Sequence, residues 1–171
     1  MSDQTYLNWP FFEHQHRQLQ AALDTWAKQH IPENHSKDVD QDCRDLVKLL
    51  GDAGWLQHAI AGCNFGAHAD VIDTRAICLL RETLARYSGL ADFAFAMQGL
   101  GSGAISLFGS EVQKARYLPK VANGELIAAF ALSEPDAGSD VAAMQCAARL
   151  VQDVDGDYYL LDGEKTWISN G

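Results

Sequence analysis

The chain has 171 residues, which is enough for one domain of ordinary size or for one domain and part of a second. Hydrophobic residues make up 47% of the chain and charged residues 21%, a balance typical of a folded globular protein. The formal net charge is -10 and no basic stripe is present, which argues against a nucleic-acid partner.

The cysteines and the N-terminal residues indicate a reducing compartment. Cys43, Cys63, Cys78 and Cys146 are far apart and form no C-x-x-C pattern, so we expect reduced thiols and neither a zinc site nor a disulfide framework. The first residues lack the basic and apolar regions of a signal peptide, and no segment reaches the ~18 apolar residues of a membrane span. We therefore expect a cytoplasmic protein with no membrane span.

The first half of the chain has helical periodicity. Apolar residues spaced by three and four predict an amphipathic helix over about residues 10–30, with Pro10 in its first turn. A second helix is predicted over about residues 38–53, ended by Gly54. Residues 55–70 contain glycines without sustained periodicity and are predicted to form a connecting loop.

Three further helices are predicted before residue 125. One includes residues 77–87, whose apolar residues form a stripe at helical spacing, and another covers residues 91–108. Residues 91–108 are apolar nearly all round and are therefore expected to be buried. A capping-box pattern over residues 110–113 opens the last helix, and Asn123 and Gly124 end it.

The pattern changes to that of strands after Glu125. Residues 126–132 have the length and composition of a buried strand, and Asp155-Gly156 and Asp162-Gly163 are hairpin signals. Residues 165–171 resemble a core strand. The predicted fold class is α+β: an N-terminal all-α helical domain over residues 1–125, then the first strands of an antiparallel β-domain over residues 126–171. Because so few strands would leave an open sheet edge, we expect an incomplete β-domain and a fragment of a longer protein, with a small finished sheet as the alternative.

Two apparent motifs are rejected as sites. Residues 99–104, "GLGSGA", fit a dinucleotide fingerprint, but they lie inside a helical stretch and no acidic residue follows at the required distance. Small residues that permit close helix packing are the preferred interpretation. The histidines have no cysteine or paired carboxylate nearby in the sequence, so none is assigned a role and no metal site is predicted.

The loop "ALSEPDAGSDVAAM", residues 131–144, is the strongest candidate site. Gly138 allows close approach of a ligand to the backbone, and Ser133 and Ser139 supply hydroxyl groups. Pro135 fixes the turn. From the residues alone, the loop is either a polar ligand-binding loop or an ordinary acidic turn.

This loop resembles the signature of the acyl-CoA dehydrogenases. The segment "QKARYLPKVANGELIAAFALSEP" is similar to the helix and strand that precede that signature, and "YLLDGEKTWISNG" is similar to the family's next hairpin. The resemblance implies an N-terminal helical domain, a middle β-domain and a C-terminal helical bundle. This chain would hold the first and part of the second.

The resemblance also implies the ligands and their residues. FAD would be bound by Phe130, Leu132, Ser133, Gly138, Ser139, Trp167, Ile168 and Ser169. Ser139 would also contact the acyl-CoA substrate, and the helix over residues 91–108 would wall the acyl pocket. The family places Glu134 in a structural position in the loop, so we assign it no catalytic role.

The reaction implied is α,β-dehydrogenation of an acyl-CoA thioester, with a hydride passing to flavin N5. A carboxylate removes the α-proton; it would lie beyond Gly171, so we assign no catalytic residue here and expect the chain alone to be inactive. Electrons would pass to an external acceptor such as an electron-transfer flavoprotein, and the full-length protein would be a homo-oligomer. An acyl-CoA oxidase-like flavoenzyme and a non-catalytic helical scaffold or partner-binding domain remain alternatives. The segment "AGCNFGAHAD" departs from the family's usual pattern near the acyl pocket.

Overall fold

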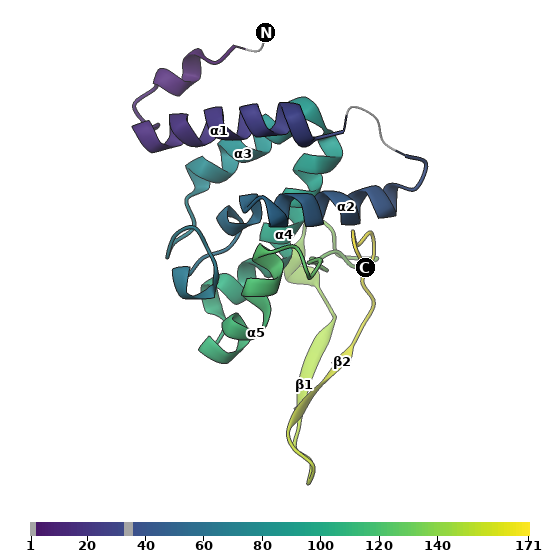
Figure 1. The fold of residues 1–171 in the computed structure, drawn as a ribbon. Helices are drawn as coiled ribbons and strands as arrows, with labels where there is room; N and C mark the ends of the chain where they lie inside the picture. The colour runs from purple at the N-terminus through teal and green to yellow at the C-terminus, as the bar shows by residue number, and fades with distance from the viewer. Residues whose placement is uncertain (1–2, 33–35) are drawn as a thin grey trace. The chain divides into compact units, whose positions relative to one another are not determined.

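The computed structural model describes residues 3–32 and 36–171 (Figure 1). The chain divides into two compact units, Met1–Ala128 and Ala129–Gly171, which we call the helical unit and the β-unit. Among the described residues, no helix combines the length and apolar character needed to cross a membrane.

The helical unit contains the five predicted helices together with short 3-10 turns. In chain order the elements are η1 Thr5–Asn8, α1 His14–His30, α2 Val39–Asp52, η2 Trp55–His58, η3 Cys63–Phe65, α3 Thr74–Tyr87, α4 Gly89–Phe108 and α5 Glu111–Ala122. The prediction that Pro10 lies in the first turn of α1 is wrong. The helix begins at His14, where the Glu13 backbone N–H donates to His16 Nδ1 across 3.0 Å in a capping box.

Local hydrogen bonds explain where the later helices begin and end. The Ser88 hydroxyl accepts from the Ala91 amide at the start of α4. The predicted capping box at Ser110 and Gln113 is confirmed, since each side chain bonds the other residue's backbone N–H. Gly54 and Gly124, with φ of 81° and 72°, take the left-handed conformation that ends a helix and that glycine adopts most easily.

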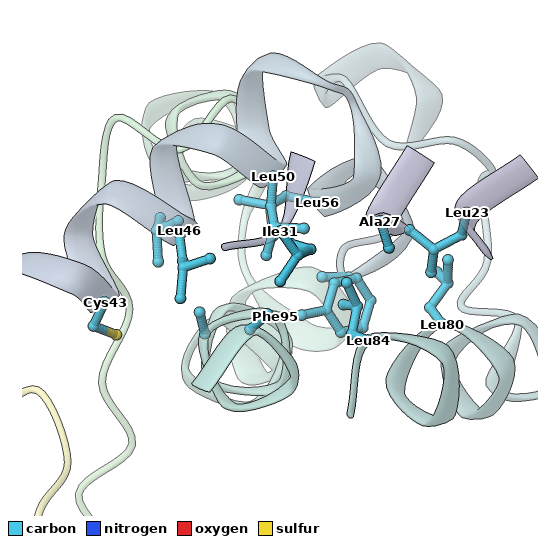
Figure 2. Close-up of a cluster of buried hydrophobic side chains, with 14 residues drawn as sticks. Leu23, Ala27, Ile31, Cys43, Leu46, Leu50, Leu56, Leu80, Leu84 and Phe95 are labelled. Carbon is cyan, nitrogen blue, oxygen red and sulfur yellow. The ribbon is translucent and has the colours of Figure 1, made fainter. Parts of the chain in front are cut away.

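The core of the helical unit lies where α1, α2, α3 and α4 meet. Figure 2 shows leucines from the first three of these helices and Phe95 of α4 in one cluster of buried side chains. The side chains buried there include Leu23, Leu50, Leu80, Leu84 and Phe95. Burying each of these large apolar side chains contributes about 1.5–3 kcal/mol, so this cluster holds the helices together.

Burial of α4 on nearly all sides was predicted, and this is wrong in part. Phe93, Leu100 and Leu107 are 38%, 52% and 58% exposed, and their spacing of seven places them on one stripe of the helix. The predicted close packing of residues 99–104 is confirmed at Gly99 only: a Cβ there would lie 3.3 Å from the Ala59 carbonyl oxygen, whereas a Cβ on Gly103 would meet nothing within 4 Å. Gly99 therefore allows close approach of the backbone at Ala59.

Residues 126–132 do not form the predicted buried strand. Gln98, which is fully buried, donates from Nε2 to the Val121 and Leu126 carbonyls and accepts from the Ala128 amide at Oε1, with distances of 2.8–3.2 Å. Two backbone groups of the segment are thus bonded to a helix side chain. A strand requires a neighbouring strand as partner, and none is paired with these residues in the described part of the chain.

The β-unit contains one antiparallel hairpin. Strand β1 (Ala147–Val151) pairs with β2 (Tyr158–Asp162) in the register Ala147↔Asp162 to Val151↔Tyr158 (Figure 1). The first predicted hairpin turn is confirmed, since Gly156 lies between the strands with φ of 125°. The helical first part followed by antiparallel strands confirms the predicted α+β class.

The remaining strand predictions for the β-unit are wrong. Gly163, with φ of 144°, ends β2 and opens no second hairpin in this unit. Residues 165–171 form no strand, because Trp167 and Asn170 have φ of 57° and 60°, which interrupts an extended backbone.

Candidate functional site

The candidate site is the loop over residues 133–140 at the start of the β-unit. The Glu134 amide donates to the Ala137 carbonyl across 3.0 Å, and the Ala137 amide donates to the Glu134 carbonyl across 3.2 Å. These two bonds close a tight turn over Pro135 and Asp136, as the sequence predicts. The backbone shape of the loop is therefore set locally.

A buried carboxylate connects this loop to the start of β1. Glu134 is 7% exposed, and its oxygens accept from the amides of Gln145 and Cys146 at 2.7 and 2.9 Å. The Lys165 ammonium lies 2.9 Å from Oε1. The Gln145 amide foremost, then Lys165, lower the pKa of Glu134 to about 2 against the opposing effect of desolvation. Such a weak base with occupied oxygens is unsuited to proton abstraction near neutral pH.

The loop is also bonded to the segment that follows β2. Lys165 Nζ donates to the Leu132 carbonyl across 2.9 Å, and the Thr166 amide donates to the Ser133 carbonyl across 2.9 Å. Residues 132–134 and 165–166 are about thirty positions apart in the sequence but directly bonded in the structure. Two of the segments that carry the predicted cofactor residues are therefore brought together.

The predicted cofactor residues differ in exposure. Trp167 is 92% exposed and Phe130 38%, while the others are half-buried or exposed: Leu132, Ser133, Gly138, Ser139, Ile168 and Ser169. A Cβ added at Gly138 would meet no atom within 4 Å, so the space at this backbone position is open. The set offers an indole face, hydroxyl groups and an accessible backbone, which are chemically suited to an aromatic ring carrying polar groups.

A hollow of about 300 Å³ beside the loop is lined by residues outside the predicted cofactor set. Its lining includes four carboxylate side chains, from Glu134, Asp136, Asp162 and Glu164, and none of the predicted cofactor residues. Carboxylates repel phosphate groups, so this hollow is a poor site for the pyrophosphate of a dinucleotide. The exposed residues on the loop and after Lys165 are the better candidates for binding a dinucleotide.

The helical unit contains a larger cavity that sequence reasoning missed. It has a volume of about 480 Å³ and lies among α1, the start of α3 and residues 57–71, with His16, His58 and His68 in its lining. The rings of His58 and His68 have centroids 4.1 Å apart. Burial, and then the charge of His68, lower the pKa of His58 to about 4.

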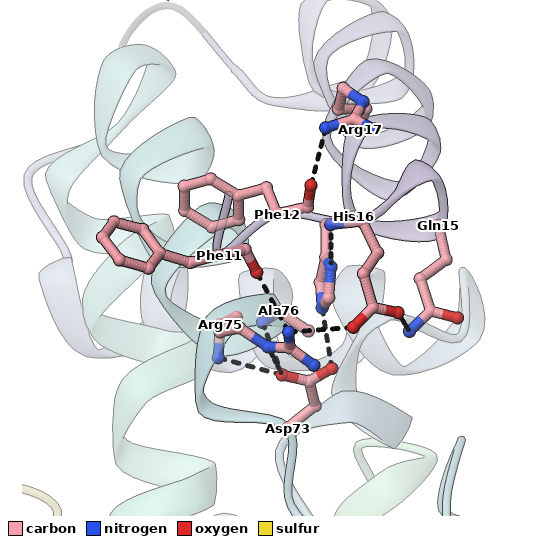
Figure 3. Close-up of polar contacts among 9 residues, drawn as sticks. Phe11, Phe12, Gln15, His16, Arg17, Asp73, Arg75 and Ala76 are labelled. Atoms are coloured by element: carbon pink, nitrogen blue, oxygen red, sulfur yellow. Dashed lines mark hydrogen bonds and ion pairs between the residues drawn. The ribbon is translucent and has the colours of Figure 1, made fainter. Parts of the chain in front are cut away.

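His16, which also lines this cavity, is part of a polar network shown in Figure 3. His16 Nε2 lies 2.8 Å from Asp73 Oδ2, and the other Asp73 oxygen accepts from the Arg75 and Ala76 amides that begin α3. Arg75 also donates to the Phe11 carbonyl across 3.0 Å. The network ties the start of α1 to the start of α3. Among residues 3–32 and 36–171, no group of three or more His, Cys, Asp or Glu side chains could hold a metal ion.

Comparison with known proteins identifies the two units. Residues 13–125 match the family model "Acyl-CoA dehydrogenase, N-terminal domain", and residues 129–171 match "Acyl-CoA dehydrogenase, middle domain". The fold and the two matches thus define a chain with a helical domain followed by a segment with antiparallel strands. The chain belongs to the acyl-CoA dehydrogenase family.

Individual relatives agree with this assignment. The chain is 33% identical to mitochondrial isovaleryl-CoA dehydrogenase of Bos taurus over 167 residues, covering 91% of this chain and 36% of the relative. It is 31% identical to an acyl-CoA dehydrogenase of Bacillus anthracis solved in complex with FAD, with a TM-score of 0.74, covering 93% of this chain and 27% of that one. It is 30% identical to glutaryl-CoA dehydrogenase of Mycobacterium smegmatis, with a TM-score of 0.75, covering 94% of this chain and 40% of that one. The chain therefore spans less than half the length of these relatives.

Proposed function

We propose that this chain supplies the helical domain and part of the flavin-binding β-domain of an FAD-dependent acyl-CoA dehydrogenase. The observation that carries the proposal is the pairing of the signature loop with the segment after β2, through Ser133 with Thr166 and Leu132 with Lys165. The family match and the relative solved with FAD support the same cofactor. The domains are proposed to be residues 1–125 and 126–171.

When bound, FAD would accept the hydride that leaves the β-carbon of the acyl thioester. The chain's own residues would bind and orient that cofactor. We propose that Trp167 covers an aromatic face, that Ser133 and Ser169 donate to polar atoms of the ring, and that Gly138 and Ser139 bind phosphate. The remaining cofactor residues proposed are Phe130, Leu132 and Ile168. The exposed indole and the open space at Gly138 fit these roles.

Ser139 of the β-unit is proposed to contact the acyl-CoA substrate. In the helical unit, α4 is proposed to wall the acyl pocket. The exposed stripe of Phe93, Leu100 and Leu107 supports this proposal, because an acyl chain gains free energy when it leaves water for an apolar surface. Which acyl group is bound would follow from the shape of this surface in the whole protein.

No residue of this chain is proposed as the catalytic base. Glu134, the carboxylate in the loop, has a pKa of about 2 and accepts hydrogen bonds from Gln145, Cys146 and Lys165. We therefore propose that the chain alone binds ligand without turning it over. The whole protein is proposed to pass electrons to an external acceptor such as an electron-transfer flavoprotein and to form a homo-oligomer.

A flavin titration tests the proposal. FAD is titrated with the 171-residue chain while flavin fluorescence anisotropy is followed, and Trp167→Ala is compared with Tyr159→Ala, a control at a 67% exposed strand position. An aromatic stacking contact of about 0.5–1.5 kcal/mol predicts that Trp167→Ala weakens binding roughly twofold to tenfold, with the control unchanged. Absence of saturable binding to the wild-type chain, or equal affinities for both variants, would contradict the proposal.

A further inference from the structure

Lys165 makes contacts to two separate segments of the β-unit. Its ammonium donates to the Leu132 carbonyl and to Glu134 Oε1, both across 2.9 Å, and it lies 3.6 Å from the Met144 sulfur. The Lys165 side chain is 24% exposed and that of Glu134 7% exposed, so the ion pair is largely shielded from solvent. Among residues 132–134 and 165–166, Lys165 makes two of the three hydrogen bonds that join the segments.

The contacts require both the charge and the length of a lysine side chain. An ammonium has three donors, and here it serves a neutral carbonyl and a carboxylate at the same time. Glu134 in turn holds the Gln145 and Cys146 amides at the start of β1. Loss of the ammonium would leave a shielded carboxylate without its cation, which is unfavourable enough to displace the loop.

We infer that Lys165 is a positioning residue for the signature loop over residues 131–144, holding Leu132 and Ser133 beside residues 166–169. The inference rests on the proposed function, because these are the residues proposed to bind FAD. Lys165 would act through Glu134 and the Leu132 carbonyl, since its three contacts occupy the ammonium. Its effect on the cofactor would therefore be indirect.

The test compares Lys165→Met with Lys28→Met in the full 171-residue chain. Methionine keeps much of the length of lysine without the charge, and Lys28 is an exposed residue of α1 in the other unit. FAD affinity is measured by anisotropy, and hydrogen exchange of residues 133–146 and 165–169 is measured without FAD. We expect Lys165→Met to bind FAD roughly tenfold more weakly and to exchange faster in both segments, with Lys28→Met unchanged.

A charge-preserving variant separates positioning from a general loss of structure. Lys165→Arg keeps a cation beside Glu134 and should recover part of the FAD affinity, whereas Lys165→Met should not. Helical signal and thermal unfolding of the helical unit should be the same in all variants. This control shows that the fold of residues 1–128 is intact.

The outcomes separate this inference from the proposed function. If the wild-type chain binds FAD and Lys165→Met binds it equally well, the inference is wrong although the proposed function stands. Faster exchange with unchanged FAD affinity would also overturn it, because Lys165 would then be structural only. A wild-type chain that fails to bind FAD would contradict the proposed function, while faster exchange in Lys165→Met would still support the role of Lys165 in joining the two segments.

Discussion

The two units of this chain are stabilised in different ways. The helical unit buries a cluster of apolar side chains among four helices, with Leu50, Leu84 and Phe95 at most 1% exposed. The β-unit has an exposed hairpin, in which Tyr159 is 67% and Leu161 72% exposed. Its loops are joined by polar contacts centred on Glu134 and Lys165. Apolar burial thus dominates one unit, and hydrogen bonds to charged groups dominate the other.

This difference predicts separate responses to substitution and to pH. A change in the apolar core should unfold the helical unit and leave the loop contacts of the β-unit in place. A change in the polar contacts should loosen the loops of the β-unit and leave the helical unit folded. A variant that disturbs both units equally would count against this separation.

The largest effect is expected for Phe95→Ala in the helical core. Phe95 is 1% exposed and fully surrounded by the core cluster, so its truncation should cost about 3–5 kcal/mol of unfolding free energy. Urea unfolding followed by far-ultraviolet circular dichroism measures the change. Phe108→Ala, at an 87% exposed position of the same helix, is the control and should change stability by less than about 0.5 kcal/mol.

Acid should destabilise the helical unit through His58. The folded pKa is lowered from 6.5 to about 4, so the neutral form is favoured on folding. The stability contributed is present above pH 6.5 and is lost as the pH falls through 4. Unfolding free energies measured at pH 7, 5.5 and 4 should fall more steeply for wild type than for His58→Gln. Parallel profiles for the two proteins would contradict this role of His58.

Glycine substitutions compare packing in the two units directly. A Cβ at Gly51 would lie 2.4 Å from the backbone of Asn123, so Gly51→Ala should destabilise the helical unit by about 1–3 kcal/mol. A Cβ at Gly138 would meet nothing within 4 Å. Gly138→Ala should therefore be within about 0.5 kcal/mol of wild type in chemical unfolding. Equal effects at the two positions would show that the β-unit is packed more tightly than described.

The most local effect is expected for Glu134. Its folded pKa is lowered from 4.5 to about 2, so its contribution to stability is present above pH 4.5 and is lost as the pH falls through 2. Nuclear magnetic resonance shifts of the Gln145 and Cys146 amides should titrate with a midpoint near pH 2. The same shifts should be absent from Glu134→Gln, and a midpoint near 4.5 in wild type would contradict the buried contacts.

The sequence predicted the helices because their signals are local. Apolar spacing, the Ser110 capping box and the left-handed glycines Gly54 and Gly124 all act within a few residues, and the structure confirms them. Pro10 was misplaced because a 3-10 turn and the Glu13 cap set the start of α1 instead. Local patterns were thus sufficient for most helix ends but not for that one.

The strand predictions failed because a strand depends on partners far away in the sequence. Residues 126–132 have strand-like composition, but the Gln98 side chain bonds the backbone of Leu126 and Ala128. The contacts of Lys165 with Leu132 and Glu134, and of His16 with Asp73, likewise join residues at least thirty-one positions apart. The signature loop could be found from its sequence, whereas the ion pair behind it could not.

We propose that the cofactor is bound by the signature loop and by the segment after β2. Hydrogen exchange of the 171-residue chain, measured with and without a saturating concentration of FAD, tests it most directly. We expect slower exchange with FAD in residues 130–139 and 165–169. Protection confined to the cavity lined by His16, His58 and His68, or no protection anywhere, would contradict it.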